Sequence, residues 1–219
     1  MQPSSSRQGP AVPPWEIGRP QPAFVALASS GAFRGRVLDV GCGTGEHALL
    51  AAGIGLDVTG VDVDDVALRT AANKAAERGL TASFRHLDAR RLAEFGAARF
   101  DTVIDCELFH ALEGADRVAY VAGLRVVLRP GGRFVMLCDR VDQRAVPHRV
   151  SRDDIRAAFA DGWRVDSIEP AVIDTTVHPS GARGWLAALT RLAADPSAAS
   201  APSAPPAQAA QANRNEGPT

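Results

Sequence analysis

Apolar residues in this chain fall into short runs that alternate with longer amphipathic segments. The first run, Val37, Leu38 and Val40, is typical of a strand that is buried on both faces of a parallel sheet. Similar runs predict strands at 37–40, 56–62, 82–87, 100–105, 134–137, 163–168 and 185–190. Helical patterns lie between the strands, at 23–30, 47–52, 64–78, 90–95, 115–128 and 151–159. This alternation indicates an α/β fold, with a parallel sheet and helices on both of its faces.

The first predicted strand leads directly into three glycines, Gly41, Gly43 and Gly45. Glycine lets the backbone turn sharply and approach a ligand closely, and the next helix directs its free N–H groups at that ligand. A dinucleotide-binding turn would have its third glycine at residue 46, where this chain has Glu46. Asp39 precedes the glycines, and a carboxylate suits a ligand with positive charge better than a pyrophosphate. The turn therefore predicts a nucleotide-like ligand and disfavours a NAD-linked oxidoreductase.

Composition narrows the class of partner. The 219 residues suffice for one domain, and a formal net charge of -1 lacks the basic excess of nucleic-acid binders. No apolar run approaches the length of a membrane span, and residues 1–14 do not resemble a signal peptide. The cysteines Cys42, Cys106 and Cys138 have no C-x-x-C spacing, and Lys74 is the sole lysine. We therefore expect a cytoplasmic monomer with reduced thiols and a small-molecule substrate, without a metal, membrane or nucleic-acid partner.

The ends of the chain differ in composition from its centre. Residues 1–12 and the Ala/Pro/Ser-rich residues 194–219 have too few large apolar side chains to fold, so both are predicted to be disordered. Residues 13–193 are predicted to form the single domain. Its first segment, 13–22, contains four prolines and is predicted to be a stiff, extended arm. Trp15 within it either anchors the arm to the core or faces a ligand.

Several motifs resemble those of the class I S-adenosylmethionine-dependent methyltransferases. D-x-G-x-G-x-G at 39–45 resembles the first motif of this family, and L-R-P-G-G-R-F at 128–134 resembles its last common one. The Pro-Trp-acid-x-Gly sequence of the arm resembles the thiopurine, thiol and halide methyltransferases, in which this arm lies over the cofactor. The resemblance covers about residues 13–191. It implies a Rossmann-like fold with a mostly parallel seven-stranded sheet, a C-terminal antiparallel hairpin, and S-adenosyl-L-methionine as the cofactor.

Acidic residues at the predicted strand ends indicate where that cofactor binds. Asp62 follows the glycines by about 20 residues, the distance at which a carboxylate meets ribose hydroxyls, although Asp64 or Asp65 could supply a helix cap just as well. The resemblance implies that Asp88 binds the adenine amino group, with capping of the next short helix as the alternative. The predicted cofactor-binding residues are Trp15, Asp39, Gly41, Cys42, Gly43, Thr44, Gly45, Asp62, Val63, Asp88, Ala89, Asp105 and Cys106.

The segment 106–110, C-E-L-F-H, is predicted to form the reacting end of the site, because ligands bind outside the carboxyl ends of parallel strands. Glu107 and His110 are the predicted catalytic residues, and Phe109 could line the substrate side. A histidine can take a proton from a thiol or hydroxyl near neutral pH, while helix capping or packing is the alternative for His110. The thiopurine branch tends to have an arginine where this chain has Cys106. The resemblance therefore does not transfer a specific substrate.

The predicted function is in-line transfer of a methyl group to a small molecule, with a thiol or another soft nucleophile as the acceptor. A soft nucleophile needs little or no base, whereas a hydroxyl or amine needs one. O- or N-methylation of a secondary metabolite is an alternative, as is a non-catalytic cofactor-binding sensor or partner module. The polar loop 139–150 is either a solvated surface loop or a lid over the substrate, and the link 174–184 could reach the site.

Overall fold

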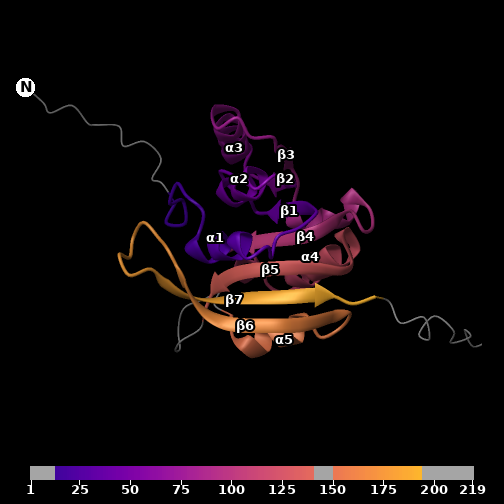
Figure 1. The fold of residues 1–219 in the computed structure, drawn as a ribbon. Coiled ribbons are helices and arrows are strands. Elements are labelled where there is room, and N and C mark those ends of the chain that lie inside the picture. Colours follow the sequence, from indigo (N-terminus) through magenta and orange to yellow (C-terminus); the bar gives the residue numbers. More distant parts are fainter. Residues whose placement is uncertain (1–12, 141–149, 194–219) are drawn as a thin grey trace, which may run out of the picture.

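The computed structural model describes residues 13–140 and 150–193, and these form one seven-stranded sheet with helices packed against it (Figure 1). The strands are β1 (Arg36–Val40), β2 (Asp57–Asp62), β3 (Ser83–His86), β4 (Phe100–Cys106), β5 (Leu128–Asp139), β6 (Trp163–Ile173) and β7 (Ala182–Arg191). The α-helices are α1 (Pro22–Ser29), α2 (Glu46–Gly53), α3 (Asp65–Glu77), α4 (Gly114–Val127) and α5 (Arg152–Ala158), and the 3-10 helices are η1 (Ala89–Phe95) and η2 (Phe109–Ala111). The termini that were predicted to be disordered, and residues 141–149 of the predicted lid, lie outside the described residues.

The strand order β3-β2-β1-β4-β5-β7-β6 confirms the predicted fold class. Strands β1 to β5 pair in parallel, and β7 pairs antiparallel with both β5 and β6. The fifth strand differs from its prediction, because it begins at Leu128 and includes the R-P-G-G sequence that was expected to interrupt the chain. Leu128 pairs with Phe100, and a shift in register before Thr102 accommodates the extra residues.

Two apolar layers hold the sheet between the helices. Val37 of β1 packs in the layer with Phe24 of α1 and Ala48 of α2. Leu38, the next residue, lies in the opposite layer with Leu124 of α4. Successive side chains of a strand point to opposite faces, so β1 is buried on both sides, as its continuous apolar run predicted. Within the two described stretches, no helix is both long enough and apolar enough to cross a bilayer.

This topology brings three chain segments to one edge of the sheet. Strand β1 lies between β2 and β4, at the point where the strand order reverses. The glycine turn follows β1, Asp62 ends β2, and the 106–110 segment follows β4. Ligands of open α/β sheets bind at such a reversal point, outside the carboxyl ends of the strands.

Candidate active site

The glycine turn adopts a backbone that other residues rarely tolerate. Gly41, Gly43 and Gly45 have φ values of +68°, +50° and +88°. The N–H of Gly41 donates to the carbonyl of Val61, which ties the turn to the end of β2 at 2.8 Å. A Cβ on Gly45 would lie 2.7 Å from the Cβ of Ala71, so this glycine also lets α3 pack closely. The sequence therefore needs glycine here for both conformation and space.

Two cavities meet at the carboxyl edge of the sheet. The first, of about 290 Å³, lies between the arm and the segment after β4. The second, of about 260 Å³, lies between the ends of β2 and β3. Gly41, Asp62 and Leu108 line both of them. An elongated ligand with two different ends, joined near Asp62, would fit this arrangement.

The predicted cofactor residues are divided between these cavities. Trp15, Gly41, Cys42, Gly43, Thr44, Asp62 and Cys106 line the first cavity. Asp62, Val63, Asp88 and Ala89 line the second. Three of the predicted residues, Asp39, Gly45 and Asp105, line neither of the two cavities.

Asp62 is held rigidly where the cavities join. Its Oδ2 accepts a hydrogen bond from the N–H of Gly43 at 2.8 Å, and its Oδ1 accepts one from the N–H of Asp64 at 2.9 Å. Asp64 is the residue that caps α3, because its side chain accepts from the N–H groups of Val66 and Ala67. Asp64 is therefore the helix cap, and the Asp62 side chain lines both cavities.

Asp88 has the cap role that was the alternative to adenine binding. Its Oδ1 accepts a hydrogen bond from the N–H of Arg90 at 2.9 Å, at the start of η1. The carboxylate also forms an ion pair with the Arg90 guanidinium, whose hydrogen bonds lower the pKa of Asp88. Since Asp88 also lines the second cavity, capping and a contact with adenine are compatible, and the latter stays a prediction.

Asp39 and Asp105 lie beneath the site rather than in its walls. Asp105 is fully buried, and its carboxylate accepts hydrogen bonds from the Tyr120 hydroxyl at 2.7 Å and from the N–H groups of Leu108 and Phe109. Asp39 is 1% exposed, and neither of its oxygens has a hydrogen-bond partner among the described residues. Our expectation of direct contact with the cofactor therefore has no support from the cavity walls. The physical reason is that both residues belong to strands, whose side chains point into the layers above and below the sheet.

Burial makes Asp39 a group whose charge opposes folding. Desolvation raises the pKa of Asp39 to about 7; the nearby N–H of Ala48, which does not meet the geometry of a hydrogen bond, partly lowers it, and the charges of Asp105 and Asp62 raise it further. Between its usual value of 3.8 and about 7, the folded state binds a proton that the unfolded state has released, so the free energy of unfolding falls as pH rises. We expect Asp39→Asn to unfold like the wild type near pH 4 and to be more stable by roughly 4 kcal/mol at pH 8. Urea unfolding across this pH range measures the difference, and parallel pH dependences of the two proteins would contradict the assignment.

Glu107 and His110 both line the first cavity, beside Cys106. Glu107 has a φ of +68°, a left-handed conformation that residues other than glycine seldom adopt, and its N–H donates to the carbonyl of Leu137 at 2.8 Å. Burial, together with the charges of Asp139 and Asp105, raises the pKa of Glu107 to about 7. The Nδ1 atom of His110 accepts a long hydrogen bond, of 3.4 Å, from the N–H of Asp139. The geometry therefore offers two groups that could accept a proton at this end.

The arm contributes several cavity residues that the sequence analysis missed. Glu16, Arg19 and Gln21 line the first cavity with Trp15, which is 62% exposed. His47 also lines this cavity, and its Nε2 accepts a hydrogen bond from the N–H of Gln21 at 3.1 Å. Burial lowers the pKa of His47 to about 4, so its imidazole is neutral at pH 7 and serves to hold the arm.

Glu46 was noted in the sequence only because it is not glycine. In the structure it lines the first cavity and pairs with Lys74 and Arg78, which lower its pKa against the opposing effect of burial. Glu16, which shares Lys74 with Glu46 as an ion-pair partner, lies 30 residues earlier in the chain. Sequence spacing gives no signal for such a cluster, whereas the Pro-Trp-acid-x-Gly motif could have pointed to Glu16.

Known proteins that resemble this chain include methyltransferases, as the glycine turn and the sheet topology lead one to expect. Residues 37–132 match a family model described as a methyltransferase domain. A relative from Mycobacteroides abscessus, 2-heptyl-1-hydroxyquinolin-4(1H)-one methyltransferase, is 36% identical over 74% of this chain and 73% of its own length. Probable thiol methyltransferase 2 from Arabidopsis thaliana is 29% identical over 63% of this chain and 62% of its own.

Solved structures show the same relationship. One, from work on the conversion of a disulfide bond into a thioacetal group during echinomycin biosynthesis, is 36% identical, with a TM-score of 0.77 over 85% of this chain and 87% of that one. Another, a Burkholderia thailandensis N1-methyltransferase with S-adenosylhomocysteine bound, shares the fold with a TM-score of 0.66 at 21% identity, over 78% of this chain and 77% of that one. The sheet topology, the glycine turn and these matches together place the chain in the class I S-adenosylmethionine-dependent methyltransferases.

Proposed function

We propose that this chain methylates a small thiol, or another soft nucleophile, at the end of the first cavity that contains Glu107 and His110. The observation that carries the proposal is that Glu107 and His110 line the same cavity as the glycine turn and as Trp15 and Ile17 of the arm. The first cavity, of about 290 Å³, would hold the methionine portion together with the reacting group of a small acceptor.

The residues present fit the cofactor. The space where a Cβ of Gly43 would lie is open, so a ligand atom can approach the backbone there, whereas a Cβ on Gly41 would lie 3.2 Å from Leu108. We propose that the backbone at 41–45 and the wall at Thr44 hold the methionine portion, and that Asp62 binds the ribose hydroxyls. Val63, Asp88 and Ala89 would then bind the adenine in the second cavity. When bound, S-adenosylmethionine supplies an electrophilic methyl group on a positively charged sulfur.

The chain's own residues would then act mainly by positioning. In-line displacement requires the acceptor atom to lie about 3 to 3.5 Å from the methyl carbon and opposite the sulfur, and such alignment supplies much of the rate. Trp15 and Ile17 would exclude water from this line. For an acceptor that binds as its conjugate acid, a carboxylate oxygen of Glu107 or a ring nitrogen of His110 would receive the proton. For an acceptor that is already an anion, neither is needed.

Sulfur is favoured by two relatives whose names concern thiol methylation and the conversion of a disulfide bond. The second candidate is O-methylation, and it has support of its own. The relative from M. abscessus is named for a substrate with a hydroxyl and a ring carbonyl, and Glu107 is a group suited to remove a hydroxyl proton. We further propose that the protein acts as a monomer in the cytoplasm, where its three cysteines, which lack C-x-x-C spacing, would remain reduced thiols.

Turnover against a panel of acceptors tests the proposal. The purified protein, with S-adenosylmethionine, is offered small thiols, halides, hydroxylated heteroaromatics and amines, and S-adenosylhomocysteine is quantified. We expect thiols to give kcat/KM at least about 10-fold above that for hydroxyls of similar size, since a thiolate forms readily near neutral pH and is strongly nucleophilic. Turnover confined to hydroxyls would replace the first candidate with the second, and turnover confined to amines would contradict both.

A further inference from the structure

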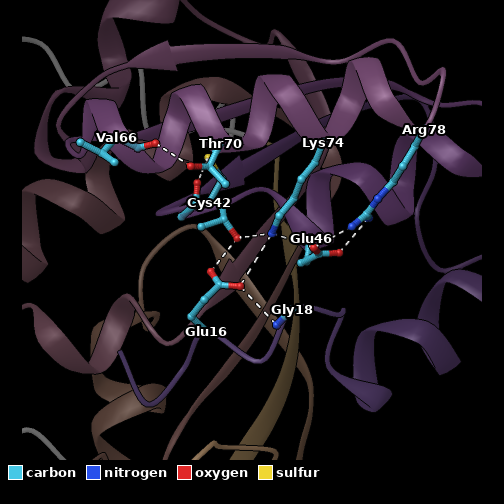
Figure 2. Close-up of polar contacts among 10 residues, drawn as sticks. Glu16, Gly18, Cys42, Glu46, Val66, Thr70, Lys74 and Arg78 are labelled. Atoms are coloured by element: carbon cyan, nitrogen blue, oxygen red, sulfur yellow. Dashed lines mark hydrogen bonds and ion pairs between the residues drawn. The ribbon is translucent and has the colours of Figure 1, made fainter. Parts of the chain in front are cut away.

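Lys74, the sole lysine of the chain, joins three segments of the cofactor cavity without lining that cavity itself. It extends from α3, and its Nζ donates hydrogen bonds to Thr44 Oγ1 at 2.7 Å and to Glu46 Oε1 at 2.8 Å. The same nitrogen lies 3.8 Å from Glu16 Oε1 of the arm. Figure 2 shows Lys74 reaching from its helix towards Glu46 and Glu16, with dashed lines to both neighbours.

Thr44 completes the connection between Lys74 and the arm. Its Oγ1 donates to Glu16 Oε2 at 2.6 Å and accepts from Lys74, so its single hydroxyl hydrogen has a fixed direction. The other carboxylate oxygen of Glu16 accepts the N–H of Gly18 at 3.2 Å. Glu16 is thereby held between its own arm and the glycine turn, with the ammonium group of Lys74 behind it.

Lys74 and the neighbouring cation Arg78 differ in their ion-pair partners. The Arg78 guanidinium binds both oxygens of Glu46, each at 2.9 Å, and no ion pair joins it to Glu16 in the part of the chain that the structure describes. Over that same part, the ion pair of Glu16 is the one with Lys74. Their side chains are only 24% and 21% exposed, so solvent screens this pair less than an open surface pair. Without Lys74, the arm would place an uncompensated carboxylate beside the cavity.

The arm has a second attachment, at its other side. Pro14 accepts a hydrogen bond from the N–H of Thr176 at 2.9 Å, and Arg19 pairs with Asp174 at 2.6 Å. These contacts fix the arm to the link between β6 and β7. Lys74 and Thr44 attach Glu16 on the opposite wall, and His47 holds the N–H of Gln21, so the arm spans the first cavity between these attachments and the link.

We propose that Lys74 is a positioning residue that holds the arm across the cofactor cavity. This role rests on the proposed placement of the cofactor in that cavity. Loss of Lys74 should release the arm, expose the bound cofactor and speed its dissociation. The reacting atoms at Glu107 and His110 lie on another segment, so methyl transfer from an enzyme already saturated with cofactor should continue.

Four proteins test this by calorimetry with S-adenosylhomocysteine: wild type, Lys74→Met, Lys74→Arg and Arg78→Met. We expect Kd to rise about 10-fold in Lys74→Met and to recover to within about 3-fold of wild type in Lys74→Arg. Arg78→Met is the matched control, because it removes the other cation from Glu46 while the arm keeps its partners; its Kd should change by less than about 2-fold. With a turnover substrate, Lys74→Met should raise the KM for the cofactor and leave kcat within about 2-fold.

The single lysine also allows a readout that needs no activity. An amine-reactive acetylating reagent, followed by mass spectrometry of the Lys74 peptide, reports access to this side chain. We expect S-adenosylhomocysteine to slow the reaction at Lys74 at least about 10-fold in the wild type and much less in Glu16→Gln, since the arm then lacks its charge partner. Glu16 is on the arm, outside the core, so this variant remains informative if Lys74→Met fails to fold.

Two outcomes would overturn the proposal in distinguishable ways. Wild-type Kd in both Lys74→Met and Glu16→Gln, with normal turnover, would remove the role of Lys74 and leave the proposed function intact. Absence of S-adenosylhomocysteine binding in the wild-type protein would remove the cofactor placement and the role of Lys74 together.

Discussion

Replacing Asp62 by alanine is expected to weaken binding of S-adenosylmethionine and S-adenosylhomocysteine at least about 100-fold. Asp62 lies where the two cavities join, and each carboxylate oxygen already accepts one backbone N–H. A carboxylate oxygen has a second lone pair, so each can still accept a hydrogen bond from a ribose hydroxyl. Two hydrogen bonds to a charged group, at about 1.5 kcal/mol or more each, correspond to at least about 100-fold in Kd. Calorimetry with S-adenosylhomocysteine measures the loss.

Two further variants separate this contact from loss of structure. Asp64→Ala removes the cap of α3, two residues away, and should cost about 1 kcal/mol of stability without changing the affinity for the cofactor. Asp62→Asn keeps the shape of the side chain but loses its charge and half of its acceptor capacity, so its Kd should fall between those of wild type and Asp62→Ala. Equal affinity of Asp62→Ala and Asp64→Ala would end the ribose assignment.

Asp62 also shows how far the sequence can lead. The alternation of strands and helices predicts which strand ends share an edge, and the glycine turn and Asp62 do share one. The sequence could not decide which of the acids at 62, 64 and 65 caps the helix, because all three suit an N-cap. The dihedral angles of Asp64 and its contacts with Val66 and Ala67 decide the point.

The buried acids show a different limit. Asp39 and Asp105 are each the last residue but one of an apolar strand, a position from which a side chain can point either towards the sheet edge or into a layer beside it. What holds Asp105 inside is Tyr120, which lies 15 residues further along and in α4. No local pattern encodes that pairing, so the sequence alone placed both acids against the cofactor.

Contacts between residues far apart in the chain could not be predicted from the sequence either. Glu16 and Lys74 are 58 residues apart, and their pairing depends on how α3 packs against the glycine turn. The close approach of Ala71 to Gly45 sets that packing. A single sequence shows which face of α3 is apolar, but it does not show how closely that face packs against the glycine turn.

Glu107→Gln is expected to lower kcat by roughly 100- to 1,000-fold with an acceptor that must lose a proton, because a positioned base supplies about that factor. The raised pKa of Glu107, about 7, means that its carboxylate forms as pH rises through 7. For a hydroxyl acceptor, wild-type kcat should therefore increase between pH 6 and 8 and then level off. In Glu107→Gln this rise should be absent. Initial rates at saturating cofactor across this range measure both effects.

An acceptor that is already ionised at pH 6, such as a halide or an acidic aromatic thiol, is the control for this variant. Its rate should be within about 3-fold in Glu107→Gln, because no proton has to be moved. His110→Gln serves as the matched substitution on the same segment, since His110 lines the same end of the cavity. If His110→Gln abolishes the pH-dependent rise and Glu107→Gln keeps it, the base is the histidine. If both variants keep the rise and the rate, the acceptor reaches the cavity as an anion, and the left-handed backbone at Glu107 then serves to shape the wall rather than to remove a proton.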